Sequence, residues 1–287
     1  MRPGGDGSIN ILFWNTNIPK SNNKKADNIN SSLVEMVLEN DVDILSLAEY
    51  SENIQQLCDT LNASSKKNYV PAPIVGAYRV TAITNENYQV EPIIENNHYA
   101  IIKIVMGSKE IIFAMIHNIS KLRYSDKAQR VKLRQFHECI VKLENNLKCF
   151  NTLAIGDFNA NPFEEATVGS DGMHAIPYYK NSKIRESREV LGEVRKMFYN
   201  PTWKLFGSRD IPFATYFYND SGEPVNFYWN AFDQVMIRPS LIDFFDTDKI
   251  KIITETTNHP LLAGEKPDKI KYSDHLPLFC SLKEELV

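Results

Sequence analysis

Short apolar runs alternate with amphipathic segments along the first quarter of the chain. Residues 9–14 and 43–48 are short, mostly apolar runs, which are typical of buried strands. Between them, residues 29–38 place apolar side chains at every fourth position, which predicts a helix with one apolar stripe. Residues 54–61 repeat this stripe over a shorter stretch. The pattern therefore predicts a strand–helix–strand–helix order.

The next part of the chain has the pattern of successive strands. Residues 69–115 contain short apolar runs that are separated by polar turns. Residues 101–105 and 111–116 flank Gly107 and Ser108, which together predict a hairpin.

A long helical stripe and further strands follow. Residues 126–147 predict a helix, residues 153–155 a buried strand, and residues 190–198 another helix. From Thr215 onward the pattern returns to strands, with a turn at residues 219–222 between two aromatic runs. The core-facing side chains expected on the long helix are Val131, Phe136, Ile140, Leu143 and Leu147.

Strands joined both by helices and by hairpins predict one α/β domain with mixed sheets covered by helices. The expected domain spans residues 1–287, with a core over about residues 9–284. The chain has 287 residues, 43% of them hydrophobic and 24% charged, as in ordinary globular proteins. Its net charge of −4 gives no overall attraction to nucleic acid, so polyanion binding would depend on a local patch or a bound metal.

The sequence predicts neither a signal peptide nor a membrane-spanning helix. Its N-terminal segment lacks an apolar stretch of the signal-peptide kind, and no run approaches the length of a membrane-spanning helix. The four cysteines have the character of reduced core thiols. We therefore expect a cytoplasmic protein without a membrane segment.

Polar side chains stand at the ends of six predicted strands. Such ends converge at the ligand-binding and catalytic sites of α/β folds. A single Glu or Asn at a strand end is more often a cap or turn residue, and a lone His is more often a core histidine. The recurrence at six separate ends favours a site. These ends carry Asn15 and Asn17, Glu49, His117 and Asn118, Asp157 and Asn159, Asp233, and Asp274 with His275.

Part of this set has the chemistry of a metal site. Glu49 and Asp274 offer the hard oxygen ligands that Mg²⁺ and Mn²⁺ prefer. Asn15 could orient a ligand without adding charge. The sequence therefore predicts Mg²⁺ or Mn²⁺ as the cofactor.

The rest of the set suits acid–base work on a phosphate ester. Asp233 could hold His275 in one tautomer and raise its basicity, while Asp157 and Asn159 could position an attacking water and a phosphate oxygen. Together with a metal, these groups would catalyse in-line attack on a phosphate ester.

These residues resemble the endonuclease/exonuclease/phosphatase family, which includes DNase I, exonuclease III-type AP endonucleases, deadenylases and neutral sphingomyelinases. The resemblance spans nearly the whole chain and follows the family's order. The matching segments are WN ending at Asn15, LAE ending at Glu49, IHN at His117, GDFNANP from Gly156, FDQV at Asp233 and SDHLPL from Ser273.

The resemblance implies a four-layer sandwich in which two mixed sheets are flanked by helices, with a divalent-metal phosphodiesterase site at one end. It implies that Glu49 is the principal metal ligand with Asn15 and Asp274 nearby, and that Asp233 and His275 form a carboxylate–histidine pair. By the same resemblance, the remaining catalytic residues are His117 at the scissile phosphate, and Asp157 and Asn159 at the nucleophile.

Two segments depart from the family's patterns. Residues 76–85, GAYRVTAITN, match the family's usual third strand poorly. The segment NAFDQV replaces the motif of the inositol polyphosphate phosphatases, which disfavours a phosphoinositide substrate. The aromatic runs around residues 214–235 are similar to the hairpin of exonuclease III-like enzymes, whereas His117 is closer to the DNase I, sphingomyelinase and deadenylase branches.

Two further features bear on the substrate. Six basic residues occur within the fourteen residues 121–134, where they could contact phosphates or form a solvated helix face. An aromatic cluster at residues 213–229 could stack on a base or pack in the core. The candidate substrate contacts are Asn17, Asn118, Arg123, Lys127, Arg130, Trp229 and Asn230.

The leading function is a metal-dependent nuclease that cleaves DNA or RNA by in-line attack of an activated water. The alternative is a phosphatase or phosphodiesterase for a small-molecule or phospholipid ester, which the acidic net charge favours slightly. A catalytically silent binding module is disfavoured, because every expected catalytic position is filled.

Overall fold

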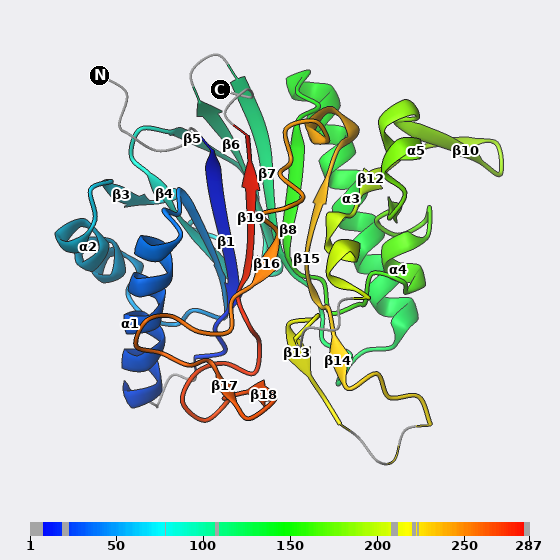
Figure 1. Cartoon of the computed structure of the whole chain (residues 1–287). Coiled ribbons are helices and arrows are strands. Elements are labelled where there is room, and N and C mark those ends of the chain that lie inside the picture. The colour runs from blue at the N-terminus through cyan, green and yellow to red at the C-terminus, as the bar shows by residue number, and fades with distance from the viewer. Residues whose placement is uncertain are drawn as a thin grey trace.

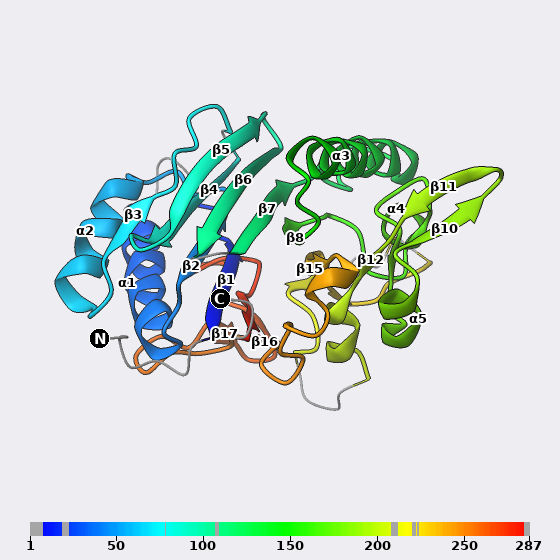
Figure 2. The same cartoon turned by 90° about the horizontal axis from the view of Figure 1, so that it is seen from above.

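Two large β-sheets face each other, and helices cover their outer faces (Figure 1). In Figure 1, α1 and α2 lie on the left of the sheets and α3, α4 and α5 on the right; Figure 2 shows the same layers from above. This arrangement is the expected four-layer α/β sandwich. The computed structural model describes residues 8–18, 23–77, 79–106, 109–207, 212–219, 222 and 224–283.

The first sheet has six strands in the order β16-β19-β1-β2-β4-β3. β1 and β2 are parallel, and the other neighbours are antiparallel. The strands are β1 (Ile9–Asn15), β2 (Ile44–Ala48), β3 (Tyr69–Pro71), β4 (Val80–Asn85), β16 (Lys251–Ile252) and β19 (Leu278–Leu282), and the covering helices are α1 (Asn23–Glu39) and α2 (Ile54–Ser64).

The second sheet has seven strands in the order β5-β6-β7-β8-β15-β12-β9. β7 and β8 are parallel, so this sheet is also mixed. The strands are β5 (Gln89–Glu95), β6 (Tyr99–Met106), β7 (Lys109–His117), β8 (Thr152–Asp157), β9 (Ala175–Ile176), β12 (Phe198–Tyr199) and β15 (Asp233–Ile237), and the helices on its side are α3 (Asp126–Leu147), α4 (Glu165–Val168) and α5 (Tyr179–Ile184).

Short elements complete the fold near the ends of the two sheets. Figure 1 places the pairs β13–β14 and β17–β18 at the bottom. These elements are β10 (Ser187–Val190), β11 (Glu193–Lys196), β13 (Tyr216–Phe217), β14 (Trp229–Asn230), β17 (Leu262–Ala263), β18 (Lys266–Pro267) and the 3₁₀ turns Pro201–Leu205 and Pro239–Leu241.

Each central strand divides its side chains between two apolar layers. In β1, Ile11 and Phe13 belong to the layer between the sheets, whereas Leu12 and Trp14 pack under α1 and α2. The period of two in a strand produces this division. Strands buried on both faces read as the continuous apolar runs that the sequence contains.

The helix expected over residues 190–198 is wrong. This stretch forms the hairpin β10–β11 followed by β12. Leu191 and Gly192 have φ values of 52° and 81°, the positive pair that a two-residue hairpin turn requires. Leu191 is fully exposed at the tip, so its helix-like spacing with Val194 and Phe198 did not reflect a common apolar face.

The long helix is confirmed with one correction. α3 covers residues 126–147, and its N-terminus is capped by Ser125, whose side chain accepts a hydrogen bond from the Ala128 amide. Val131 was expected to face the core, but it is 41% exposed. Gln129 and Glu144 are buried instead, because both make polar contacts with the second sheet or its loops.

The remaining expectations on secondary structure are largely confirmed. β6 and β7 form the expected antiparallel pair, whereas the turn at Gly107 and Ser108 lies outside the described residues. Likewise, β13 and β14 pair around the expected turn, of which Asp220 and Ser221 are not described. The four cysteines are free thiols, and Cys139 alone of these is only half-buried. Within the described ranges, no helix has the length and apolar character that crossing a bilayer would need.

Candidate active site

Strand alternation carries polar side chains into the space between the two sheets. On β8, Leu153 and Ile155 belong to the layer between the sheets, so Asp157, two positions later, faces the same way. The same parity holds for His117 on β7 and Asp233 on β15. A buried apolar strand therefore ends in a polar residue that replaces the next core side chain.

The register of the second sheet sets three of these residues in one row. His117 is paired with Asp157 across the parallel β7–β8 ladder, and Asp233 is paired with Asp157 across the antiparallel β8–β15 ladder. From the opposite sheet, the Asn15 side chain donates a hydrogen bond of 3.0 Å to Asp157 Oδ2. Asp157 is therefore the meeting point of both sheets.

Gly156 allows β7 and β8 to approach closely just before Asp157. A Cβ atom at this position would lie 2.0 Å from the carbonyl oxygen of Ile116. No side chain fits there without a shift of the backbone. The glycine of the GDFN segment is thus explained by packing against β7.

Three site residues adopt left-handed backbone conformations. The φ values are 43° at Asn17, 50° at Glu49 and 50° at Asn159. For residues other than glycine, such conformations are uncommon and concentrate at functional sites. Glu49 directly follows the last residue of β2. Because of its positive φ, the alternation of side chains between the two faces of a strand no longer determines the direction of the Glu49 side chain.

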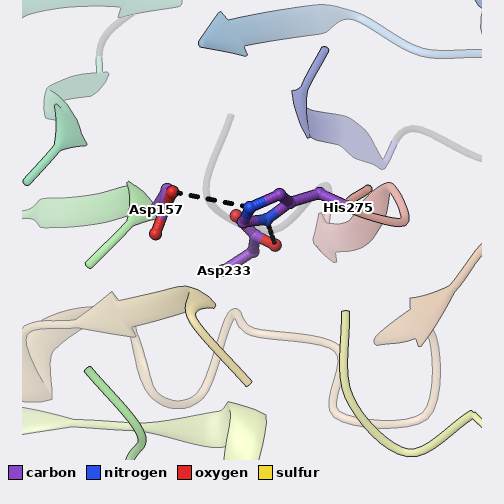
Figure 3. Close-up of side chains that lie close together, drawn as sticks. All are labelled: Asp157, Asp233 and His275. Carbon is purple, nitrogen blue, oxygen red and sulfur yellow. Dashed lines mark hydrogen bonds and ion pairs between the residues drawn. The ribbon is translucent and has the colours of Figure 1, made fainter. Parts of the chain in front are cut away.

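The carboxylate–histidine pair expected from the sequence is present (Figure 3). Asp233 Oδ2 lies 2.8 Å from His275 Nδ1, and His275 Nε2 lies 3.9 Å from Asp157 Oδ2. Burial alone would lower the pKa of His275, but the charge and hydrogen bond of Asp233 raise it to about 10. His275 is therefore an imidazolium at neutral pH.

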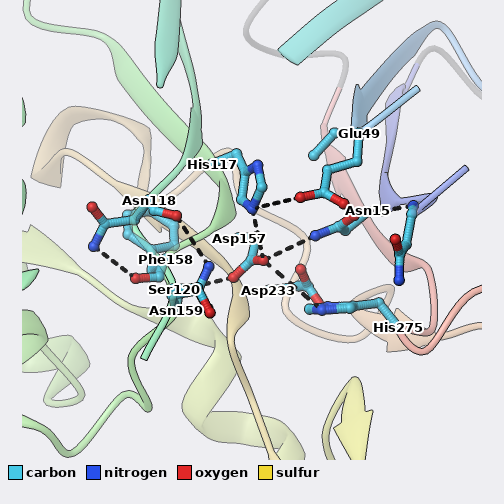
Figure 4. A network of polar contacts seen from close by, with 12 residues as sticks. Asn15, Glu49, His117, Asn118, Ser120, Asp157, Phe158, Asn159, Asp233 and His275 are labelled. Carbon is cyan, nitrogen blue, oxygen red and sulfur yellow. Dashed lines mark hydrogen bonds and ion pairs between the residues drawn. The ribbon is translucent and has the colours of Figure 1, made fainter. Parts of the chain in front are cut away.

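Asp157 is held in place and tuned by its surroundings (Figure 4). Its Oδ1 accepts a hydrogen bond of 2.8 Å from the Asn159 amide. Burial raises the pKa of Asp157 to about 7, with the His275 charge acting against this rise and the Asp233 charge adding to it. Its carboxyl group can therefore change protonation state near neutral pH.

His117 lies between two carboxylates yet stays neutral. Its Nε2 is 3.5 Å from Glu49 Oε1 and 3.7 Å from Asp157 Oδ2 (Figure 4). Burial, followed by the charge of Arg79, lowers the pKa of His117 to about 3. A neutral ring with Nε2 facing two carboxylates serves as a hydrogen-bond donor at that atom.

The site is supported by residues that sequence reasoning did not identify. Ser273 Oγ donates to the Asn15 carbonyl oxygen at 2.6 Å, and Trp14 Nε1 donates to the His275 carbonyl oxygen at 2.8 Å. Gln129, on α3, donates to the Asn159 carbonyl oxygen at 2.8 Å. These partners are distant in sequence, so only the folded arrangement reveals them.

The predicted oxygen ligands Glu49 and Asp274 line the same cleft. The Glu49 side chain is 37% exposed at the cleft, and Asp274 also lines it while accepting a hydrogen bond from Asn17 at 2.9 Å. Mg²⁺ and Mn²⁺ prefer sites with only a few carboxylate ligands and with room for water molecules. Burial lowers the pKa of the nearby Lys25 ammonium, while the charges of Asp274 and Glu49 act to raise it.

A second group of possible ligands has a different explanation. Ligand atoms of Asp157, Asp233 and His275 lie within 4.8 Å of one another, close enough to hold a metal ion. However, His275 Nδ1 is already bonded to Asp233, and the ring is protonated at neutral pH. This group therefore suits proton transfer better than metal binding, and the oxygen ligands around Glu49 fit a hard cation better.

A cleft of about 1090 Å³ opens at this site, with Asp157 and His275 in its wall and Asp233 buried behind them. Most of the predicted site residues line it, and so do Tyr216, Tyr218 and Phe227 of the predicted aromatic cluster. Arg79 and His98 also line it and were not predicted. The predicted residues in its wall are Asn15, Asn17, Glu49, His117, Arg123, Asp157, Asn159, Asn230, Asp274 and His275.

Some predicted substrate contacts lie elsewhere. Arg130 is paired with Glu165 at 2.8 Å and Asp171 at 3.4 Å, outside the cleft wall. Trp229 is 7% exposed and packs in the layer beneath α1 and α2. Lys127 and Asn118 also lie outside the cleft wall, and Lys127 is exposed on α3. Asn118 is buried: its side chain donates to the Phe158 carbonyl oxygen, and its own carbonyl oxygen accepts a hydrogen bond from the Asn159 side chain.

Comparisons with known proteins link this chain to solved structures only. No family model and no curated protein match it. TDP2 from Caenorhabditis elegans is similar in structure at 15% identity and a TM-score of 0.57, over 96% of this chain and 98% of that chain. A protein from Leptotrichia buccalis described as an endonuclease/exonuclease/phosphatase family protein matches at 14% identity and a TM-score of 0.54, over 96% and 99%. TDP2 from D. rerio, solved with a single-strand DNA product, matches at 17% identity and a TM-score of 0.53, over 96% and 98%.

Proposed function

We propose that this chain, which has the endonuclease/exonuclease/phosphatase fold, hydrolyses phosphodiester bonds of nucleic acid with the help of a divalent metal ion. The observation that carries the proposal is the convergence at one cleft. Strand ends from two facing sheets bring three features to the same place. These are the Asp157 carboxyl group with its raised pKa, the Asp233–His275 pair, and the oxygen ligands of Glu49 and Asp274. A structural role needs none of these features together.

Asp157 is the proposed general base. A water molecule attacks the phosphorus and gives its proton to the Asp157 carboxylate, while the bond from phosphorus to the leaving oxygen breaks. The leaving oxygen takes a proton from solvent water. A pKa of about 7 matches this task, because a general base works best near the operating pH.

His275 and His117 have separate proposed roles. The His275 imidazolium, held by Asp233, stabilises the negative charge that grows on the phosphoryl oxygens. Neutral His117 and the Asn159 side chain orient the phosphate by hydrogen bonds. Different burial and charge surroundings thus give two histidines different protonation states in one cleft.

Glu49 and Asp274, with Asn15 beside them, would hold the Mg²⁺ or Mn²⁺ ion. When bound, the ion would neutralise phosphate charge and polarise the reacting ester. The carboxylates of the cleft would otherwise repel a phosphate, so the ion also makes substrate binding possible.

A nucleic acid is the preferred substrate class. Tyr218 and Phe227 line the cleft with exposed aromatic surface on which bases can stack, and Arg123 adds a positive charge. The D. rerio TDP2 structure with a single-strand DNA product supports this choice. A small-molecule or phospholipid ester is the second candidate, because Arg130 is neutralised by ion pairs and the net charge is −4.

The test is incubation with single-stranded DNA, duplex DNA, RNA and a small phosphate diester, each with Mg²⁺, Mn²⁺ or EDTA. We expect cleavage of at least one polynucleotide, its loss in EDTA and its loss in the Asp157→Asn variant. Cleavage of the small diester without any polynucleotide would favour the second candidate. Metal-independent cleavage, or equal rates in wild type and variant, would refute the proposal.

A further inference from the structure

We propose a phosphate-binding subsite beside the reaction centre, formed by Arg79 with His98 next to it, which takes the phosphate adjacent to the one that is cleaved. This inference rests on the proposed function and specifies how the polymer lies in the cleft. Neither residue was singled out by the sequence patterns. Both line the same cleft as Glu49 and His117.

Arg79 is tied to the reaction centre through its backbone. It directly precedes β4, and its carbonyl oxygen accepts a hydrogen bond of 3.1 Å from the amide of Glu49. This hydrogen bond connects the residue that follows β2 with the residue that precedes β4. The Arg79 side chain remains exposed in the cleft wall.

The surroundings of Arg79 are built to hold it in place. Glu95, at the end of β5, accepts hydrogen bonds from the amides of Val75 and Gly76, the former at 3.0 Å. A Cβ atom at Gly76 would lie 2.9 Å from the Glu95 carboxylate, so the loop and the strand are in close contact. This anchor holds Val75 and Gly76, a few residues before Arg79 in sequence, against β5.

His98 is fixed to the end of β7. His98 Nδ1 donates to the His117 carbonyl oxygen at 3.2 Å, and the His117 amide donates to the His98 carbonyl oxygen at 2.7 Å. Arg79 and His98 are thus attached to the backbone of two predicted active-site residues, Glu49 and His117.

The Arg79 charge has no compensation within the described part of the chain. No carboxylate of the described residues lies within ion-pair distance of its guanidinium. Its charge instead works against protonation of His117 and, after burial, contributes to the lowered pKa of His98. A positive group that pairs with nothing and opposes two imidazolium forms gives the fold no benefit, whereas a bound phosphate would balance it.

The position of this charge distinguishes two phosphates. A residue that clamps the scissile phosphate should lie against the carboxylates that hold the metal and the nucleophile. The Arg79 guanidinium lies outside ion-pair distance of Glu49, Asp157 and Asp274, although it is close enough to influence His117. Guanidinium groups bind phosphates through paired, charge-assisted hydrogen bonds. The neighbouring phosphate of a polynucleotide is the group that fits this place.

The test pairs a protein variant with a modified substrate. The substrates are a cleavable oligonucleotide, the same oligonucleotide with one neutral methylphosphonate on either side of the scissile phosphate, and a small phosphate diester. The proteins are wild type, Arg79→Ala, Arg79→Lys and the control Arg188→Ala. Arg188 is an exposed arginine of β10, outside the cleft wall.

We expect Arg79→Ala to lower kcat/KM for the oligonucleotide by about 10- to 100-fold, the worth of a charged hydrogen bond. Hydrolysis of the small diester should change by less than about twofold, as should both activities of Arg188→Ala. Arg79→Lys should recover part of the loss. At one flanking position, the methylphosphonate should remove the difference between wild type and Arg79→Ala. This substrate lacks the phosphate charge that Arg79 binds, so removal of Arg79 has no further effect.

Three results would overturn the subsite. Equal losses on oligonucleotide and small diester would place Arg79 at the reaction centre or in folding. Independent, multiplying losses at both flanking positions would mean that neither phosphate is its partner. Unchanged affinity of Arg79→Ala for the oligonucleotide in EDTA, measured by fluorescence polarisation, would also refute it. The binding measurement does not require cleavage, so a wild type that binds but cleaves no polynucleotide would refute the proposed function alone.

Discussion

Asp233 and His275 are joined by a hydrogen bond of 2.8 Å although 42 residues separate them in sequence. Asp233 begins β15 of the second sheet, whereas His275 precedes β19 of the first. The pair therefore spans the two sheets at the end where the cleft opens. It fixes the orientation of the imidazole and keeps it charged at neutral pH.

The first prediction concerns this pair. Asp233→Asn preserves the shape of the side chain but removes the charge that holds His275 as an imidazolium. Asp233→Asn and His275→Ala should each lower the rate by about 10²- to 10⁴-fold. The double variant should be little worse than either single variant, because residues that act as one unit are strongly non-additive. Multiplied losses in steady-state assays would show that the two residues act independently.

The second prediction concerns the metal ion. Glu49→Gln should leave the fold intact but remove most of the affinity for Mg²⁺ or Mn²⁺, because a neutral amide is a poorer ligand for a hard cation than a carboxylate. Titration calorimetry measures this directly. Glu189→Gln, an exposed change on β10, is the matched control and should bind as wild type does. Unchanged ion binding by Glu49→Gln would end its assignment as the principal ligand.

The third prediction separates two arginines of the basic segment. Arg123 lines the cleft, whereas Arg130 is held by Glu165 and Asp171. Arg123→Ala should weaken nucleic-acid binding and reduce the slope of log affinity against log salt by about 1, as expected for one lost phosphate contact. Arg130→Ala and Lys127→Ala should leave that slope unchanged. A reversed order would show that the substrate runs along α3 rather than through the cleft.

The fourth prediction concerns acid stability. Burial lowers the pKa of His137 to about 3 and that of His174 to about 4, both below the unfolded value of about 6.5. Their contribution is therefore fully present above about pH 6.5 and is lost as the pH falls toward 3. His174→Gln should reduce the slope of the unfolding free energy against pH between pH 4 and 6. The expected reduction is about 1.4 kcal/mol per pH unit, the effect of one proton. Urea unfolding at several pH values measures it, with His259→Gln as control; an unaltered slope would contradict the prediction.

The fifth prediction concerns the strand that carries Asp157. Gly156→Ala should destabilise the protein by at least about 3 kcal/mol, because its Cβ would meet the Ile116 carbonyl and force β7 and β8 apart. Gly192→Ala is the control: it has a positive φ of 81° but open space around it, so only about 1 kcal/mol of backbone strain is expected. Similar losses in thermal or urea unfolding would show that close packing is not the reason for Gly156.

The polar strand ends were predictable because two local signals coincide there. An apolar run reveals a buried strand, and the first polar residue after it marks the edge of the core, as at Asn15, His117 and Asp157. The sequence alone does not show which ends meet. The family resemblance supplied that for the predicted site, and the register of β7, β8 and β15 accounts for it physically.

Other features depend on contacts that no local pattern encodes. The position of Arg79 depends on a main-chain hydrogen bond to Glu49 between neighbouring strands. The position of Arg130 depends on ion pairs with carboxylates 35 or more residues away in sequence. Aromatic spacing likewise does not show which ring faces the cleft, so Trp229 and Phe227 look alike in sequence but differ in exposure. The hairpin at Leu191 was missed because its apolar spacing mimics a helix, although Gly192 marks the turn.

The division of the site between two sheets has a kinetic consequence. The β-ladders run within each sheet, so the thickness of the apolar layer between the sheets contributes to the separation of Asn15 from Asp157. Phe13 and Phe113 are large, fully buried members of that layer. A substitution that changes side-chain volume in this layer changes the distance between the two sheets. It therefore alters the reaction rate without contacting the substrate or any reacting group.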